Sequence, residues 1–152
     1  MAIPQLADDF SEFLRLLNFH KVKYLLVGGY AVATYGYVRA TNDLDIWVEA
    51  DPDNAQRIVN ALQEFGFPAN QLKRELFLTS DQIVRMGVPP LRLEILTSIS
   101  GLRFKPCYEE REVVQMGNLD VPVISLVRLR ENKRAAGRAK DLVDLENLAD
   151  SP

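Results

Sequence analysis

The feature that most constrains the fold is the stretch VGGYAVATYGYVRATNDLDIWVE, residues 27–49. One apolar segment ends in Gly28 and Gly29, and a second apolar segment carries acids at alternate positions, Asp43 and Asp45. Alternate residues of a strand share a face, so these carboxylates lie side by side, roughly 6.6 Å apart. Two neighbouring carboxylates on a half-buried strand repel each other unless positive charge lies between them. The pattern predicts a strand whose acidic face binds a cation.

Length and charge set the broad class of protein. The chain has 152 residues and a formal net charge of −3, which predicts a single domain over residues 1–152 and no overall basic field for nucleic acid. A local basic patch that binds nucleic acid is still compatible with this net charge. The single cysteine, Cys107, excludes an internal disulfide and a cysteine-based zinc site. Without a signal peptide or an 18-residue apolar run, we expect a cytoplasmic protein that does not enter a membrane.

The periodicity of apolar residues predicts the order of elements along the chain. In the first part of the chain, helices and strands alternate. Helices are expected over 6–20, 30–37 and 55–65, and strands over 23–27 and 43–49. Two pairs of strands follow. The first pair covers 82–87 and 91–96, with a turn around Val88-Pro89-Pro90, and the second covers 111–117 and 121–125. Helices are expected from Leu126 onward, with a break at Gly137. This order predicts an α+β fold, with a mixed β-sheet flanked by helices and a helical C-terminus.

A third acid, Glu94, lies between apolar residues in the later strand and shares a face with Arg92. If the two acidic strands are neighbours, Glu94 joins Asp43 and Asp45, and three clustered carboxylates repel strongly without a metal. Oxygen ligands favour Mg²⁺ or Mn²⁺ over zinc. The alternatives are that Glu94 pairs with Arg92 or Lys73, and that the two aspartates lie on the solvated face of an edge strand.

The glycine pair fits the same scheme. Gly28 and Gly29 follow a strand and precede a helix, so backbone amides there can approach a phosphate group. A triphosphate that reaches from this turn to cations on the aspartates is the arrangement for nucleotidyl transfer. A simple tight turn is the alternative. A dinucleotide site is excluded, because it requires G-x-G-x-x-G and a single acid.

These motifs together resemble the nucleotidyltransferase superfamily. The glycine pair, the run RATNDLDI and a later acid between apolar residues follow one another in the order of that superfamily. The tail KRAAGRAKDLVDL, residues 133–145, resembles the C-terminal motif of a small bacterial branch related to abortive-infection and toxin–antitoxin nucleotidyltransferases. The matches run from about residue 24 to residue 148.

The resemblance implies roles for individual residues. Asp43, Asp45 and Glu94 would hold the metal, with Glu94 as the third carboxylate. The residues that would take part in catalysis are Asp43, Asp45, Glu94, Lys133 and Asp141. The residues that would bind the nucleotide are Gly28, Gly29, Arg39, Thr41, Lys133 and Arg138.

Lys133 also stands out by its helical position. It shares a stripe with Leu126 and Leu129, so it should point inward. An inward lysine needs a partner, either a nucleotide phosphate or Asp141, and its replacement should lower activity with little loss of stability. An exposed basic helix face is the alternative.

The sequence thus predicts a metal-dependent nucleotidyltransferase that moves a nucleoside monophosphate from an NTP to an acceptor hydroxyl and releases pyrophosphate. A tRNA end, a partner protein and a small molecule such as an antibiotic are the candidate acceptors. The alternative is a non-catalytic, antitoxin-like module on the same fold that binds a nucleotide or a partner. A metal-dependent phosphoesterase is disfavoured by the glycine pair and the lack of histidine ligands.

Overall fold

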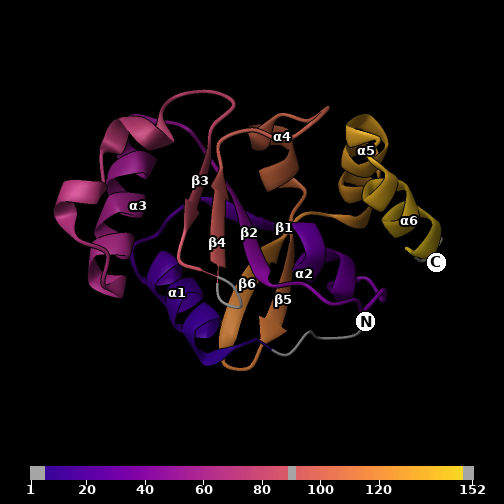
Figure 1. Ribbon diagram of the computed structural model, residues 1–152, viewed down its shortest axis with the longest axis horizontal. Coiled ribbons are helices and arrows are strands. Elements are labelled where there is room, and N and C mark those ends of the chain that lie inside the picture. Colours follow the sequence, from indigo (N-terminus) through magenta and orange to yellow (C-terminus); the bar gives the residue numbers. More distant parts are fainter. Residues whose placement is uncertain (1–5, 89–91, 149–152) are drawn as a thin grey trace.

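A mixed β-sheet forms the centre of the computed structural model, which describes residues 6–88 and 92–148 (Figure 1). Six strands of the described residues pair in the order β3-β4-β2-β1-β6-β5. Their bounds are β1 (Tyr24–Val27), β2 (Asp43–Val48), β3 (Ile83–Met86), β4 (Arg92–Leu96), β5 (Glu112–Met116) and β6 (Leu119–Val123). Two of the pairings are parallel, β2 with β4 and β1 with β6, and the others are antiparallel. The predicted α+β fold with a mixed sheet is confirmed.

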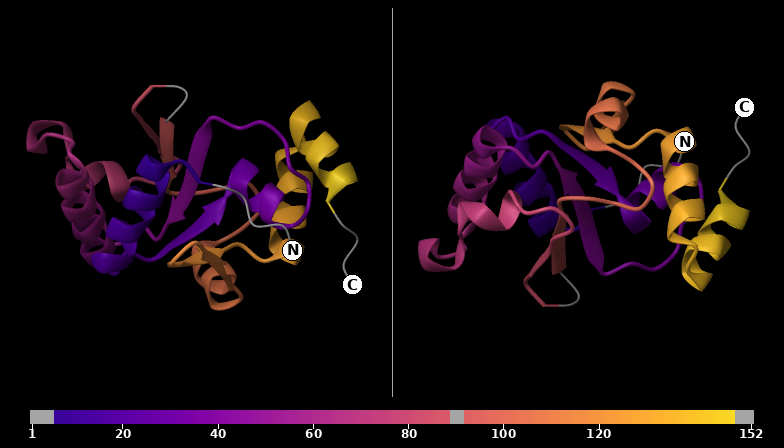
Figure 2. Two further views of the ribbon diagram at one scale, coloured as in Figure 1. Left: turned by 90° about the horizontal axis from the view of Figure 1, so that it is seen from below. Right: turned by 90° about the horizontal axis from the view of Figure 1, so that it is seen from above.

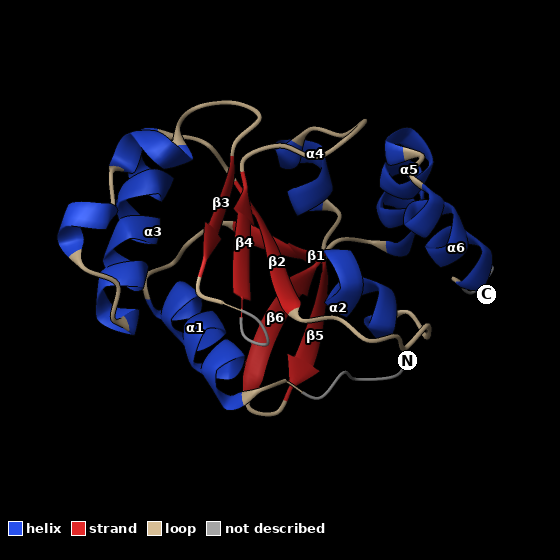
Figure 3. Cartoon of the chain, viewed as in Figure 1, coloured by secondary structure: helices blue, strands red, loops and turns tan. Residues whose placement is uncertain are grey.

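The helices flank this sheet (Figure 3). Their bounds are α1 (Asp8–Phe19), α2 (Gly28–Thr34), α3 (Pro52–Phe65), α4 (Phe104–Glu109), α5 (Leu126–Ala136) and α6 (Ala139–Asn147), with 3₁₀ turns at η1 (Ala69–Gln71) and η2 (Arg74–Phe77). The periodicity did not predict α4, because six residues with a central proline are too short to show a helical repeat. The predicted turn at Pro89-Pro90, and Leu91 in the predicted strand, lie outside the described residues.

The register of the central strands brings the acidic residues together. Strand β2 lies between β1 and β4, so it is an interior strand and the edge-strand alternative is wrong. In the parallel pair of β2 and β4, Asp43 lies opposite Arg92 and Asp45 lies opposite Glu94. On the other side of β2, Val27 at the end of β1 lies opposite Asp45. The glycine pair therefore begins beside the acids.

The two faces of β2 pack against different helices. Leu44 and Ile46, which alternate with the acids and so lie on the opposite face, are fully buried. Helices α1 and α3 lie side by side in the molecule (Figures 1 and 2). On the acidic face, the ring of Trp47 packs edge-on against Phe104 of α4, with 5.2 Å between the ring centroids. Apolar burial on both faces fixes the strand, so the direction of its carboxylates is fixed as well.

Helices α5 and α6 form a pair at the end of the molecule away from α1 and α3 (Figure 2). Gly137 separates them in a left-handed conformation, with φ of 65°, as the predicted break requires. Arg39, in the loop between α2 and β2, donates two hydrogen bonds to Asp144 of α6, at 2.7 and 2.9 Å. This contact ties the C-terminal helices to the loop that enters the acidic strand. Across the described residues, no helix combines the length and apolarity needed to cross a membrane.

Candidate active site

A cleft of about 950 Å³ opens over the acidic face of the sheet. Its walls come from the turn between β1 and α2, the loop before β2, strands β3 and β4, the segment 98–102, and the corner between α5 and α6. Asp43, Asp45 and Glu94 all line it. The elements that the sequence singled out for chemistry, far apart along the chain, thus meet in one place.

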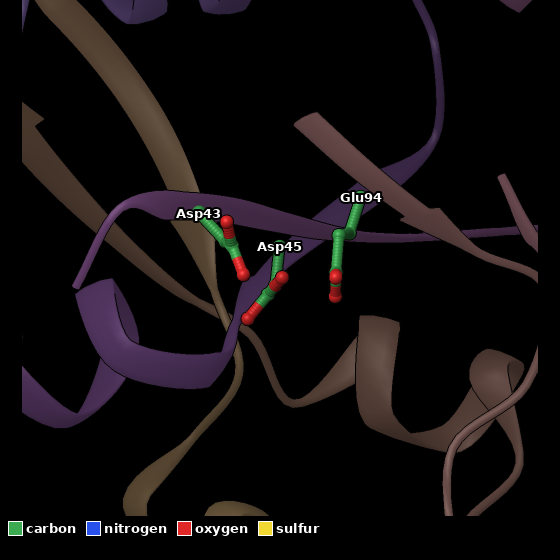
Figure 4. A group of neighbouring side chains, drawn as sticks. All are labelled: Asp43, Asp45 and Glu94. Atoms are coloured by element: carbon green, nitrogen blue, oxygen red, sulfur yellow. The ribbon is translucent and has the colours of Figure 1, made fainter. Parts of the chain in front are cut away.

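Asp43, Asp45 and Glu94 form the acidic cluster, and each offers a carboxylate oxygen within 4.8 Å of the others. Figure 4 shows the three side chains pointing the same way from two neighbouring strands. One oxygen of Asp45, Oδ1, is buried and has no hydrogen-bond partner among the described residues. A buried unpaired oxygen is unfavourable unless a ligand satisfies it. Three close oxygen donors, one of them unpaired, fit a Mg²⁺ or Mn²⁺ ion.

The electrostatics of the acidic cluster agree with this fit. Burial raises the pKa of Asp45 to about 8, with further contributions from the adjoining carboxyl of Glu94 and the charge of Asp43. The charge of Lys140 opposes the rise. A carboxyl that resists ionisation in the absence of a cation is one that a divalent ion would ionise, because metal ligands must be deprotonated.

Two arginines neutralise part of the acidic cluster. Arg92 donates to both oxygens of Asp43, at 3.0 and 2.9 Å. Arg85, on β3, donates to Glu94 at 2.8 Å, while Arg92 lies 3.7 Å from the same carboxylate. The alternative in which Glu94 pairs with Arg92 or Lys73 is therefore correct for Arg92. The second partner of Glu94 is Arg85 instead of Lys73. Sequence reasoning missed Arg85, because only the register of β3 against β4 brings it opposite Glu94.

The glycine pair is needed for close packing as well as for a turn. Gly28 has φ of 69°, and a Cβ there would lie 2.0 Å from Oδ2 of Asp45. A Cβ on Gly29 would lie 2.9 Å from Oγ1 of Thr41. The absence of side chains therefore lets Asp45 and Thr41 approach the backbone at the start of α2, where both glycines line the cleft.

Arg39 and Thr41 lie in the cleft wall and also hold the loop before β2. Arg39 bonds to Asp144, as described above, while the hydroxyl of Thr41 lies 3.3 Å from the backbone oxygen of Asp43. The contacts support the prediction that these residues steady the loop. Phosphate binding by either residue stays a prediction.

Lys133 lies at the centre of what we call the buried ion network, made up of Arg39, Lys133, Arg138, Asp141 and Asp144. Its side chain is 6% exposed, and its Nζ lies 3.3 Å from Asp141 and 2.9 Å from Asp144. The inward orientation is confirmed, and the exposed-face alternative is wrong. Asp141 is one of the two partners that the sequence left open, the other being a nucleotide phosphate. Asp144 was not foreseen, although it lies one helical turn further along α6.

The aspartates of the buried ion network lie behind the cleft. Both are almost fully buried, and neither lines the cleft, whereas Lys133 and Arg138 do. Burial raises the pKa of Asp141, but its hydrogen bond from Arg138 and the charge of Lys133 outweigh this and hold the pKa below its ordinary value. Asp144 follows the same pattern, with Arg39 and Lys133 as its partners. The structure thus shows Asp141 orienting two basic side chains, and its predicted catalytic role stays a prediction.

Lys140 also lines the cleft. The sequence placed it in a basic tail patch that could hold phosphates but gave it no individual role in the site. It lies in the same tail motif as Arg138, and it is close enough to Asp45 to lower the pKa of that carboxyl. The sequence could have indicated this position, because Lys140 directly precedes Asp141 in the first turn of α6.

The fold and the acidic cleft define a protein of the nucleotidyltransferase superfamily. A protein from Thermotoga maritima assigned as a nucleotidyltransferase has the same fold, with a TM-score of 0.61 and 16% sequence identity over 90% of this chain and 88% of that one. The lincosamide antibiotic adenylyltransferase LnuA, with lincomycin bound, aligns with a TM-score of 0.52 and 19% identity over 95% of this chain and 96% of that one. A search of curated protein sequences gives no match.

The sequence itself assigns the family. The model of the aminoglycoside-2''-adenylyltransferase family matches residues 10–148, and the chain belongs to that family. The superfamily predicted from the glycine pair and the acidic strand is therefore confirmed. The closer resemblance to the abortive-infection and toxin–antitoxin branch has no support in these comparisons and stays a prediction.

Proposed function

We propose that the protein transfers a nucleoside monophosphate, in the first instance AMP from ATP, to a hydroxyl group of a small molecule. The acceptor oxygen would form a bond to the α-phosphorus while the bond from that phosphorus to the β-phosphate oxygen breaks, and pyrophosphate would leave. The observation that carries the proposal is the acidic cluster, with three carboxylate oxygens within 4.8 Å in a cleft beside the glycine pair. Membership of an adenylyltransferase family supports adenylyl as the transferred group.

Asp43, Asp45 and Glu94 would hold a Mg²⁺ or Mn²⁺ ion. Such an ion, when bound, would neutralise phosphate charge and polarise the phosphorus under attack. The arginine contacts to Asp43 and Glu94 would have to loosen as the ion binds, because the same oxygens serve both. Glu94 would accept the proton of the acceptor hydroxyl, since it is the member of the acidic cluster on the β3 side, away from the glycine pair.

Basic residues on the opposite side would hold the triphosphate. Lys133, Arg138 and Lys140 line the cleft from α5 and α6, and Gly28 and Gly29 present their backbone there. Cations in a partly closed cleft stabilise a polyphosphate and its leaving group. Asp141 would act by positioning, because its oxygens contact Lys133 and Arg138 and it does not line the cleft.

Small molecules are the best-supported acceptors. The family is named for aminoglycosides, and LnuA is named for lincosamide antibiotics, so both names describe small hydroxylated molecules. A tRNA end and a partner protein, the other acceptors that the sequence left open, have no support from these comparisons.

The direct test is turnover with and without the acidic cluster. Wild-type protein, ATP, Mg²⁺ and a panel of hydroxylated small molecules should release pyrophosphate and give an adenylylated product by mass spectrometry. Asp45→Asn should lower this rate by about a thousandfold, the scale of losing a main electrostatic element of a site. The matched control is Asp53→Asn, an exposed acid on α3, which should keep the wild-type rate.

The same experiment separates the alternative, a non-catalytic nucleotide-binding module. The ion pairs of Arg92 and Arg85 with the acidic cluster are the observation in its favour, because they occupy two of the three carboxylates. Mg²⁺-dependent ATP binding with no product from any acceptor, and no difference between wild type and Asp45→Asn in turnover, would support that module and contradict the transferase.

A further inference from the structure

Two arginines pair with the acidic cluster, and one of them contacts two of its three members. Arg92 donates a hydrogen bond to each oxygen of Asp43, at 3.0 and 2.9 Å, and lies 3.7 Å from Glu94. Arg85 donates to Glu94 at 2.8 Å. Asp45 keeps a buried oxygen that has no partner among the described residues. An ion that binds all the carboxylates of the acidic cluster must therefore take oxygens that Arg92 now holds.

Strand pairing makes the contact of Arg92 the stronger of the two. Asp43 and Arg92 lie opposite each other on β2 and β4, which are interior strands of the sheet. Arg85 lies on the edge strand β3, and 56% of its side chain is exposed, against 32% for Arg92. A bidentate pair with a carboxylate is stronger than a single contact, and lower exposure reduces screening by water. Arg92 is therefore the arginine that competes more strongly with a metal ion.

We propose, as a step that rests on the proposed function, that Arg92 couples metal binding to nucleotide binding. In the free protein, the guanidinium of Arg92 competes with a divalent ion for the oxygens of Asp43, so the ion binds weakly. In the presence of a nucleoside triphosphate, Arg92 moves its hydrogen bonds to phosphate oxygens, and the ion and the nucleotide bind tightly together. Arg92 lines the cleft, so a ligand in the cleft can contact its side chain.

The cost of displacing Arg92 gives the physical reason. A guanidinium that loses both hydrogen bonds to Asp43 is left partly buried, without those partners and close to a divalent ion of like charge. Loss of a partner and repulsion between like charges are both unfavourable at a partly buried site. A triphosphate removes both effects, because its oxygens accept bidentate hydrogen bonds from arginine and its negative charge offsets the two cations. Linkage is reciprocal, so the ion and the nucleotide strengthen each other's binding by the same factor.

The first experiment measures the metal ion alone, so its result does not depend on nucleotide binding. Mn²⁺ is titrated into wild type, Arg92→Gln and Arg74→Gln, and the unbound ion is measured by electron paramagnetic resonance. Arg92→Gln should bind Mn²⁺ at least about tenfold more tightly than wild type, the scale of removing one like charge near a partly buried ion. Arg74 is an exposed residue of η2 outside the cleft lining, so Arg74→Gln should match wild type. Mn²⁺ affinity that Arg92→Gln leaves unchanged or lowers would overturn the inference, and so would equal gains in both variants.

Two further variants show whether the gain arises at the acidic cluster. Arg92→Lys keeps the positive charge but cannot pair with both oxygens of Asp43 in parallel, so its gain should be smaller, about threefold. It also decides the question if Arg92→Gln does not fold, because no gain in Arg92→Lys would then contradict the competition. Adding Asp45→Asn to Arg92→Gln should abolish the gain, and a gain that persists would place the ion elsewhere and overturn the inference.

The second experiment measures the coupling between metal and nucleotide. Calorimetry gives the affinity for a non-hydrolysable ATP analogue with Mn²⁺ and with EDTA, and the ratio of the two affinities is the coupling factor. The factor should be about thirtyfold or more in wild type and at least about fivefold smaller in Arg92→Gln. An equal factor in both proteins would overturn the inference. Equal affinity with Mn²⁺ and with EDTA in every variant would contradict the proposed function, and the Mn²⁺ titrations without nucleotide would still show whether Arg92 competes for the acidic cluster.

Discussion

The acidic cluster lines the cleft, whereas the aspartates of the buried ion network lie behind it, and the two groups differ in how their charges are paired. In the buried ion network, every carboxylate oxygen of Asp141 and Asp144 contacts a cation at 2.6 to 3.3 Å. In the acidic cluster, Oδ1 of Asp45 is buried and has no partner among the described residues. The pKa of both network aspartates is lowered, whereas the pKa of Asp45 is raised to about 8.

The comparison distinguishes buried charges that are fully paired within the protein from a buried carboxylate that is incompletely paired. Complete pairing inside the protein makes a buried charge a structural element, because removing either partner leaves the other uncompensated. An incompletely paired carboxylate lowers stability on its own and gains when a cation binds. The buried ion network therefore joins α5, which carries Lys133, to α6 and to the loop before β2. The acidic cluster keeps a carboxylate oxygen that the proposed metal ion would neutralise.

The largest effect on stability is expected from breaking the buried ion network at its centre. Lys133→Met keeps the length of the side chain but leaves two buried aspartates without their shared cation, so the free energy of unfolding should fall by about 3–5 kcal/mol. Chemical denaturation measures it. The sequence alone predicted little loss of stability at this position, and two contacts inside the protein reverse that expectation.

Arg134→Met is the matched control for this variant. Arg134 is an exposed neighbour on α5, so its replacement should change the free energy of unfolding by less than about 0.5 kcal/mol. Equal stability of the two variants would show that the buried ion network does not stabilise the fold, and the contrast with the acidic cluster would disappear.

A medium effect is expected where the backbone meets the acidic cluster. Gly28→Ala and Gly117→Ala both place a side chain at positive φ, of 69° and 63°, at a cost of about 1–2 kcal/mol each. At Gly28 the new Cβ also meets Asp45 at 2.0 Å, whereas no described atom lies within 4 Å of a Cβ at Gly117. Gly28→Ala should therefore be the less stable variant and should alone lose Mg²⁺ binding in calorimetry. Similar Mg²⁺ affinities of Gly28→Ala and Gly117→Ala would mean that Mg²⁺ binding does not depend on the present position of the Asp45 side chain.

The smallest effect is a pH dependence that differs between the two regions. Because the pKa of Asp45 rises from an ordinary 3.8 to about 8 in the folded protein, folding is favoured while this carboxyl is protonated, and stability falls as pH rises from about 4 to about 8. In EDTA, Asp45→Asn should melt close to wild type at pH 4 and about 3 °C or more above it at pH 8. Adding Mg²⁺ at pH 8 should stabilise wild type alone.

The buried ion network should give the opposite trend in a different pH range. The pKa of each network aspartate is lowered, so the stability they contribute is present above their ordinary pKa and is lost as pH falls below about 4. A melting difference between Asp45→Asn and wild type that stays constant from pH 4 to pH 8 would contradict the account of Asp45.

Much of the site was predictable because local patterns encode it. Alternation along 43–48 gave the strand and the shared direction of Asp43 and Asp45, and the helical stripe of α5 gave the inward orientation of Lys133. The break at Gly137 also came from local conformation, since this glycine has positive φ. Such features depend on residues a few positions apart, so the order of residue types is sufficient to predict them.

The tertiary structure decided which of these local pieces meet. Sequence could state only that Glu94 would join the aspartates if its strand were a neighbour, and the parallel pairing of β2 with β4 supplies that contact. Three more contacts likewise join segments 9 to 17 residues apart: Arg85 with Glu94, Lys133 with Asp144, and Gly28 with Asp45. Such contacts depend on strand order and register, which the burial of the whole core selects, so no local pattern in the chain contains them.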